Sequence, residues 1–397
     1  MGPVGKTVVV LGGGIGGVVA ATELRRRLSR DHRVVLIDRT GTHAFQPSFL
    51  WVMSGAREPA AVVRDLAGLR RKGVELKRAE VRAVDLGARE VETSSGKVAY
   101  DYLVMSLGAE LDPGAFPGLA EAGLTFYTLE GAAALRSRMA TFQGGRVAVL
   151  VSKLPFKCPA APYEAALILE AIVPDRGLRD RVEVEFYTPE KLPMPVAGPA
   201  VGAALKQMLE SRGIRFHPEH ALKSVDAAGR RLAFGNGVEA PFDLLAFVPP
   251  HRAPACLRDA GLLNEAGWVP VDPRTLETAH PGVFAIGDLA AIKLESGLML
   301  PKAGVFAHAE AKVVAANIAA MVEGRPSTAA FDGHGQCWVE AGGGKAAFAK
   351  GDFYASPSPA VALRKPSALW HLTKVMFERY WLLRWFRGSS ATRLRAP

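Results

Sequence analysis

The stretch VVVLGGGIGGVVAATEL, from Val8 to Leu24, decides the fold. A run of aliphatic, β-branched residues ends in glycines and leads into a helical pattern, and Gly12, Gly14 and Gly17 stand in G-x-G-x-x-G register. The first glycine permits a tight turn, the second lets the backbone approach a pyrophosphate at the helix N-terminus, and the third lets helix and sheet pack closely. The stretch therefore predicts a Rossmann-like domain that binds a dinucleotide.

Residues beside these glycines complete the predicted binding set. Asp38 ends the next strand, 21 positions after Gly17, where a carboxylate is placed to accept hydrogen bonds from an adenosine ribose. We add its neighbour Arg39 and the first helical residue, Ile15, to the cofactor-binding candidates. The glycine register alone does not separate FAD from NAD.

Further apolar, β-branched runs predict more strands, and their spacing suits parallel sheets with crossover helices. They are TVVVL (7–11), RVVLI (33–37), YLVMSL (102–107), RVAVLV (146–151), VEVEFY (182–187), FDLLAFV (242–248) and VFAI (283–286). The predicted fold is α/β, with two Rossmann-like dinucleotide-binding domains and a C-terminal amphipathic tail. From the Pro/Gly-rich passages near 111–119 and 267–273 we predict an FAD-binding domain at 1–112 and 270–324, a second Rossmann-like domain at 113–269 and a tail region at 325–397.

Composition narrows the function classes. Three scattered cysteines in 397 residues are too few for a disulfide framework or a zinc site, so we expect no metal. The start of the chain lacks the apolar h-region of a signal peptide, and no uncharged apolar run reaches the roughly 18 to 20 residues of a membrane span. The net charge of the chain is +10, and residues 361–397 contribute +7 of it, because they contain eight lysines and arginines and a single acidic residue, Glu378.

Two later segments carry a resemblance. VFAIGD (283–288) resembles the second flavin-contacting motif of the two-dinucleotide-domain flavoproteins, and YLVMSLGA (102–109) resembles their intermediate strand-turn motif. The resemblance implies FAD as the cofactor, Gly108 in the turn, and Gly287 and Asp288 at the ribityl chain. In similar flavoproteins a lysine such as Lys302, followed here by Gly304, lies by the N1 edge of the flavin, where a cation stabilises the reduced ring.

A second glycine motif is missing. The strand 146–151 is followed by SKLPFKCP (152–159), whose side chains would crowd a pyrophosphate, so NADH should bind poorly. The segment offers Cys158 near two lysines and ahead of a predicted helix, and both features should lower the thiol pKa. Glu164 follows as the predicted proton acceptor.

KCPAAPYE (157–164) resembles the redox-cysteine segment of the sulfide:quinone oxidoreductases and of flavocytochrome c sulfide dehydrogenase flavoprotein subunits. The resemblance implies that Cys337 is the partner of Cys158, that hydrosulfide attacks a disulfide or polysulfur bridge between them, and that Lys302 acts with Glu164 in catalysis. HAFQP (43–47) lacks the cysteine that links the flavin covalently in some members, so FAD should be noncovalent. Cys256 matches no family cysteine, and we interpret it as a small buried residue.

The tail favours quinone as the electron acceptor. Residues 367–388 combine aromatic residues with cations, a composition that suits the surface of an anionic membrane, and we predict two short helical pieces rather than one amphipathic helix. We expect a peripheral protein of the cell membrane, whose quinone site is flanked by some of Phe331, Trp338, Phe348 and Phe353. The sequence contains no nucleic-acid-binding module beside the basic tail, so we expect no nucleic-acid partner. A homo-oligomer is possible. The alternatives are a type II NADH:quinone oxidoreductase and a flavin-dependent redox sensor or interaction protein.

Overall fold

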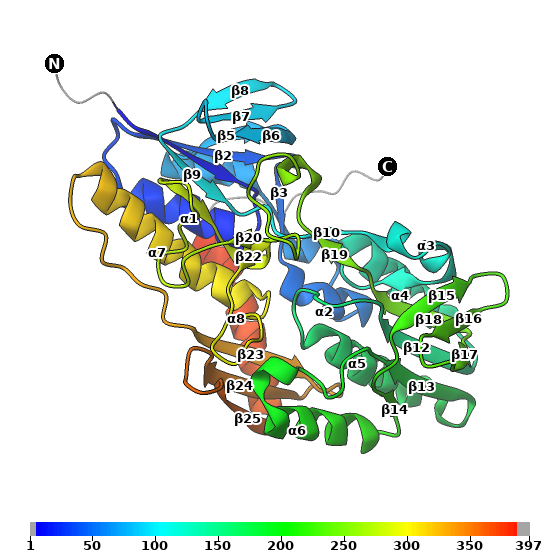
Figure 1. Cartoon of the computed structure of the whole chain (residues 1–397). Coiled ribbons are helices and arrows are strands. Elements are labelled where there is room, and N and C mark those ends of the chain that lie inside the picture. The colour runs from blue at the N-terminus through cyan, green and yellow to red at the C-terminus, as the bar shows by residue number, and fades with distance from the viewer. Residues whose placement is uncertain (1–4, 387–397) are drawn as a thin grey trace.

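The computed structural model describes residues 5–386, and its centre is a five-stranded parallel sheet (Figure 1). The strands run in the order β21 (Val283–Ala285), β9 (Tyr102–Met105), β1 (Thr7–Leu11), β2 (Arg33–Asp38), β5 (Glu75–Arg78). Helices α1 (Ile15–Arg27) and α7 (Gly304–Val322) pack together on one face. The other face meets the small antiparallel sheet of β6 (Val81–Asp85), β7 (Glu90–Thr93) and β8 (Gly96–Ala99). Early and late parts of the chain therefore meet at the glycine turn.

A second five-stranded parallel sheet forms the other half. Its order is β11 (Leu124–Thr125), β18 (Leu244–Val248), β12 (Gly145–Val151), β13 (Val182–Tyr187), β14 (Arg215–His217). It packs with α4 (Leu129–Thr141), α5 (Ala161–Asp175) and α6 (Pro199–Glu210), and the antiparallel strands β15 (Leu222–Asp226), β16 (Arg231–Phe234) and β17 (Glu239–Pro241) lie beside it. The seven predicted strands and the predicted α/β fold class are confirmed. The predicted domain limits stay a prediction.

Short elements connect and close the two halves. They are α2 (Phe49–Met53), α3 (Leu119–Ala122), the antiparallel pairs β3 (Thr42–Ala44) with β4 (Val63–Asp65) and β10 (Glu110–Leu111) with β19 (His251–Arg252), and the parallel pair β20 (Val269–Pro270) with β22 (Ala290–Ala291).

The C-terminal section is a three-stranded antiparallel sheet followed by one long helix. Strands β23 (His334–Glu340), β24 (Ala346–Asp352) and β25 (Ala360–Ser367) lead into α8 (Ala368–Phe386), which runs from this sheet to the underside of α1 and α7 (Figure 1). The prediction of two short helical pieces is wrong. The residues 387 and 388 of the predicted membrane segment, and the cations Arg387, Arg393 and Arg395, lie outside the described residues.

Helix α8 (Ala368–Phe386) buries two of its charged residues. Lys374 and Glu378 are buried and His371 is partly buried, because each finds a charged or hydrogen-bonding partner in the body of the protein. Large apolar side chains point outward instead: Leu369, Leu372, Met376, Tyr380 and Leu383, each 53–66% exposed. Their spacing of three and four residues places them on one face of the helix. The stripe faces solvent together with Arg379 and Arg384, while Lys374 and Glu378 face the protein.

One described helix, α7, is long and apolar enough to cross a membrane by length and composition. Its side chains Ala311, Val314, Ala315 and Ile318 are fully buried against the first sheet and α1. It therefore forms part of the core.

Candidate active site

The first glycine motif forms a turn that only glycine fits at two positions. Gly12 has φ of 93° and donates its N–H to the Ile37 carbonyl over 2.8 Å. A Cβ on Gly17 would lie 1.8 Å from the carbonyl oxygen of Gly12. Helix α1 can therefore start directly behind the turn, as the register predicts.

The space in front of α1 fits a pyrophosphate. A Cβ on Gly14 would meet no protein atom within 4 Å, and the helix start has neither a side-chain cap nor an acidic residue in its first turn. Unpaired N–H groups and the positive end of the helix dipole favour an anion at such a place. The residues present fit FAD at this end.

The Asp38 carboxylate holds the glycine turn and the loop behind it. Its carboxylate accepts the backbone N–H of Gly13 over 2.8 Å and those of Thr40 and Gly41 over 2.9 and 2.8 Å. Arg39, next along the chain, is exposed. The structure thus brings Asp38 to the turn and leaves Arg39 at the surface.

The second flavin motif meets the first at the end of the central sheet. Gly108 and Gly287 both have positive φ, 69° and 71°, and a Cβ on Gly108 would lie 4.0 Å from the Asp288 carboxylate. The start of α7 approaches the start of α1 so closely that a Cβ on Gly304 would lie 2.6 Å from Ile15. Two segments far apart in sequence therefore enclose one site.

Lys302 is nearly buried within this site. Its Nζ donates to the carbonyl of Asp288 over 2.7 Å and lies 3.5 Å from the ring centroid of Trp268. Burial lowers the pKa of Lys302 to about 8, although the nearby Asp288 and Glu310 carboxylates favour the charged form. Its predicted place beside the flavin stays a proposal.

Glu310 is a buried carboxylate that the sequence analysis missed. It lies on α7, is 2% exposed, and accepts the Gly287 N–H over 2.6 Å. Burial raises the pKa of Glu310 to about 8. The sequence did contain a signal for this buried carboxylate, since Glu310 is the single acidic residue in the otherwise largely apolar helix α7.

Cys158 lies in the loop between β12 and α5 with φ of 50°, a left-handed conformation that is uncommon for a residue with a Cβ. Its N–H donates to the carbonyl of Lys302 over 2.6 Å. The Tyr127 hydroxyl donates to the carbonyl of Lys157 over 2.9 Å. These bonds hold the strained loop, and such strain is found most often at functional sites.

Cys337 comes from β23, and both cysteines are affected by the same charges. Burial raises the pKa of both thiols, the Glu164 carboxylate, on α5, raises both further, and the ammonium of Lys374, on α8, opposes these effects. The Cys337 thiolate also raises the pKa of Cys158. Both cysteines are free thiols, so the pair is not joined by a disulfide in this structure.

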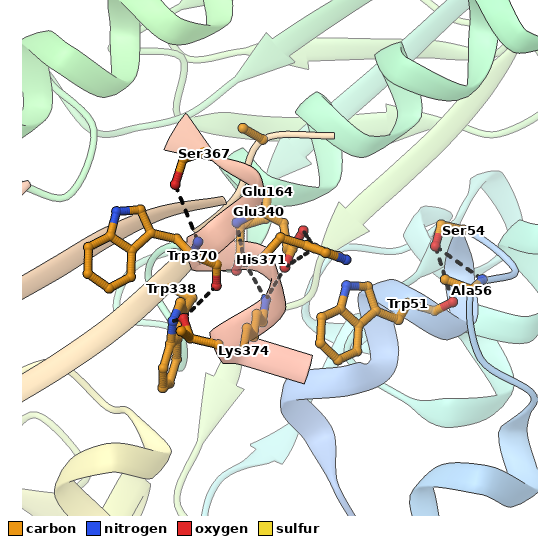
Figure 2. A network of polar contacts seen from close by, with 12 residues as sticks. Trp51, Ser54, Ala56, Glu164, Trp338, Glu340, Ser367, Trp370, His371 and Lys374 are labelled. Atoms are coloured by element: carbon orange, nitrogen blue, oxygen red, sulfur yellow. Dashed lines mark hydrogen bonds and ion pairs between the residues drawn. The ribbon is translucent and has the colours of Figure 1, made fainter. Parts of the chain in front are cut away.

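A network of buried charged residues joins α5, β23 and α8 (Figure 2). Glu164 accepts from Lys374 Nζ over 2.9 Å and from the backbone N–H of Glu340 over 2.8 Å. Lys374 Nζ also lies 3.6 Å from Glu340, whose other oxygen lies 3.0 Å from Nδ1 of His371. Burial lowers the pKa of Lys374, but the two carboxylates outweigh it, so the pKa of Lys374 stands above its ordinary value.

The expected lowering of the Cys158 pKa is wrong. Burial, reinforced by Glu164, raises the pKa of Cys158 well above that of a free thiol and that of Cys337 to about 12. Of the two neighbouring lysines, Lys153 is exposed, and burial lowers the pKa of Lys157. Loss of solvent therefore outweighs the nearby cations.

The loop that replaces a second glycine motif is filled by its own side chains. Phe156 and Lys157 are 5% and 8% exposed, and the hydroxyl of Ser152 donates to the carbonyl of Val248 over 2.6 Å. The arrangement leaves no glycine backbone to receive a pyrophosphate.

The remaining candidates are Cys256 and the four aromatic residues proposed to flank a quinone, and they lie in different parts of the structure. Cys256 packs beside the core of the first sheet but is partly exposed, so it is less buried than expected. Among the proposed quinone-flanking aromatics, Phe331 and Phe353 pack on Phe306 of α7. The other two pack toward α8, where Phe348 stacks on Trp370 with centroids 4.5 Å apart and Trp338 stacks on Phe377 at 5.1 Å.

Comparison with known proteins places this site in a family. The profile described as pyridine nucleotide-disulphide oxidoreductase matches residues 6–152 and 163–313. The mitochondrial sulfide:quinone oxidoreductase of Mus musculus is 26% identical over 369 residues, covering 88% of this chain and 79% of the relative. The crystal structure of the sulfide:quinone oxidoreductase from Aquifex aeolicus superimposes with a TM-score of 0.86 at 26% identity, covering 98% of this chain and 93% of that one.

A type II NADH:quinone oxidoreductase of Mycobacterium tuberculosis is also similar, at 26% identity over 311 residues, covering 71% of this chain and 66% of the relative. The resemblance to sulfide:quinone oxidoreductases inferred from the residues is confirmed by the matches from Mus musculus and Aquifex aeolicus.

Proposed function

The chain belongs to the pyridine nucleotide-disulphide oxidoreductase family and is an FAD-dependent oxidoreductase, and from that premise we propose that it oxidises sulfide and reduces a membrane quinone. The observation that carries the proposal is the setting of Cys158 and Cys337. Two cysteines from distant segments share Glu164 and Lys374 as charged neighbours, and Cys158 follows the end of β12, where a nicotinamide-binding member would carry glycines.

In the proposed reaction hydrosulfide attacks a disulfide between Cys158 and Cys337. One S–S bond forms and the other breaks, which leaves a persulfide on one cysteine and a thiolate on the other. Glu164 takes the proton of the persulfide, since its charge influences the pKa of both cysteine thiols. The persulfide and the thiolate then join through a new S–S bond into a trisulfide bridge, which releases two electrons, and bound FAD would supply the acceptor that relays them to quinone. A further hydrosulfide would attack the bridge, carry off the extra sulfur as sulfane sulfur or polysulfide, and let the disulfide re-form.

Residues of the chain hold the other parts of the site. The α1 N-terminus, Gly14 and Asp38 would bind the dinucleotide noncovalently, and Lys302 would place positive charge beside the reduced ring. The loop filled by Phe156 and Lys157 disfavours NADH as the electron donor.

The outer face of α8 supports a peripheral place on an anionic membrane. The stripe from Leu369 to Leu383 supplies apolar area, and the exposed Arg379 and Arg384 lie on the same helix. Apolar and cationic residues together suit the headgroup boundary, where such a helix lies parallel to the surface. Quinone would reach the enzyme from that lipid.

The test is anaerobic addition of sulfide to the FAD-loaded protein, followed by the flavin absorbance. We expect bleaching with sulfide, no bleaching with NADH, and return of the oxidised spectrum on adding a soluble quinone. Cys158→Ala and Cys337→Ala should abolish bleaching, while Cys256→Ala, the matched control, should behave as wild type. Bleaching by NADH would favour the NADH:quinone alternative, and an unaffected Cys158→Ala would refute the cysteine mechanism. Reduction by neither donor would favour a redox sensor.

A further inference from the structure

A continuous chain of hydrogen bonds links α8 to the glycine turn. The indole N–H of Trp381 donates to Nε2 of His43 over 3.2 Å, and Nδ1 of His43 lies 2.9 Å from the carbonyl oxygen of Gly13. The N–H of the same glycine donates to Asp38 over 2.8 Å. Gly13 is thus held on both sides, by Asp38 through its N–H and by His43 and the C-terminal helix through its carbonyl.

The chemistry of the partners fixes the state of the imidazole. An indole only donates and a carbonyl only accepts, so His43 is neutral, with its proton on Nδ1. Burial lowers the pKa of His43 to about 4, which keeps it in this state at neutral pH. Both His43 and Trp381 are 1% exposed, so water cannot replace either bond without opening the structure.

We propose that His43 and Trp381 are positioning residues for FAD, which lock the Gly12–Gly14 turn so that FAD affinity depends on the docking of α8. An unlocked turn must be ordered when the cofactor binds, and that ordering lowers affinity. The inference rests on FAD binding and is independent of the identity of the reductant.

The same helix offers a matched control. Trp385 lies one turn beyond Trp381, is also buried, and belongs to the same aromatic cluster, with ring centroids 5.7 Å apart. Its indole N–H has no hydrogen-bond partner among the described residues. Trp385→Phe therefore removes a similar indole without breaking the chain.

The experiment is fluorescence titration of the apoproteins with FAD, with unfolding of each apoprotein measured in parallel. We expect Trp381→Phe to weaken FAD binding by about tenfold or more, in keeping with one buried polar atom left unpaired. Trp385→Phe should change the dissociation constant by less than about twofold. Both variants lose a similar aromatic volume, but only Trp381→Phe leaves the His43 acceptor unpaired, so its apoprotein should be the less stable of the two, and FAD affinities are compared where both apoproteins are folded.

A double substitution separates positioning from general packing. In a His43→Asn background, the amide N–H can still donate to the Gly13 carbonyl, but the shorter side chain has no acceptor at the Nε2 position to reach the indole. There, Trp381→Phe should weaken FAD binding no further. His43→Asn alone should weaken it, and it serves as the test if Trp381→Phe does not fold. Equal FAD affinity in wild type and Trp381→Phe, or an equal loss in Trp385→Phe, would overturn the proposal.

Discussion

Lys374→Met removes the only ammonium that the described structure places between Glu164 and Glu340. The Nζ atom lies 2.9 and 3.6 Å from their oxygens, and all three side chains are buried, at 9, 4 and 3% exposed. Methionine has a similar length and fills the space without charge. The substitution therefore isolates the electrostatic role of the lysine.

The expected magnitude follows from burial. Breaking a buried ion pair by removing one partner costs about 3–5 kcal/mol, because it leaves an uncompensated charge. Here Glu164 loses its ammonium partner, while Glu340 keeps His371 at 3.0 Å, so we expect a fall in unfolding free energy within that range. Lys365→Met, on the exposed face of β25, should stay within about 0.5 kcal/mol of wild type.

Urea unfolding followed by circular dichroism measures the difference. Glu164→Gln added to Lys374→Met removes the stranded charge, so the double variant should be more stable than Lys374→Met alone. Stranded carboxylates have raised pKa values in the folded state, so the deficit of Lys374→Met should shrink as the pH falls from 7 to 5. A loss below about 1 kcal/mol, or a double variant that shows the sum of the single losses, would refute the reasoning.

Three further outcomes are expected. Glu164→Gln should lower the pKa of the Cys158 and Cys337 thiols and so speed their alkylation by iodoacetamide at pH 8 by up to roughly tenfold. The same substitution should slow bleaching of the flavin by sulfide, and alkylation at the wild-type rate contradicts the reasoning. Met376→Glu, on the outer face of α8, should weaken binding to anionic vesicles by about ten- to hundredfold, whereas Val238→Glu, equally a surface site, should not; co-sedimentation measures both. Gly14→Ala should leave apoprotein stability unchanged and lower FAD affinity, because no protein atom lies near the added methyl group; an unchanged titration curve would place the cofactor elsewhere.

Local patterns predicted much of the fold. The strands and the glycine turn are specified by residues close together in sequence, and β1 begins and ends at Thr7 and Leu11 as predicted. The second flavin motif was recognisable for the same reason, since Val283 to Asp288 is one continuous segment. Such features need little tertiary information.

Helix α8 was predicted wrongly because its partners are remote. A helical wheel assigns charged residues to solvent, but Glu378 pairs with Ser48 and Arg57, more than 300 positions away. The predicted lowering of the Cys158 pKa was wrong for a related reason. Neighbouring lysines can be read from the sequence, whereas the burial that raises the pKa of Cys158 arises only when distant segments assemble.

Helix α8 buries Lys374 and Glu378 and exposes an apolar stripe, which has a practical consequence for protein production. A surface-binding helix is a common first target for deletion when a detergent-free preparation is wanted. Here deletion would also remove Trp381, which reaches a histidine 338 positions earlier, and Lys374, which neutralises two buried acids. Solubility is better sought by changing Leu372, Met376 and Leu383 to polar residues, since their side chains point away from everything the helix holds in place.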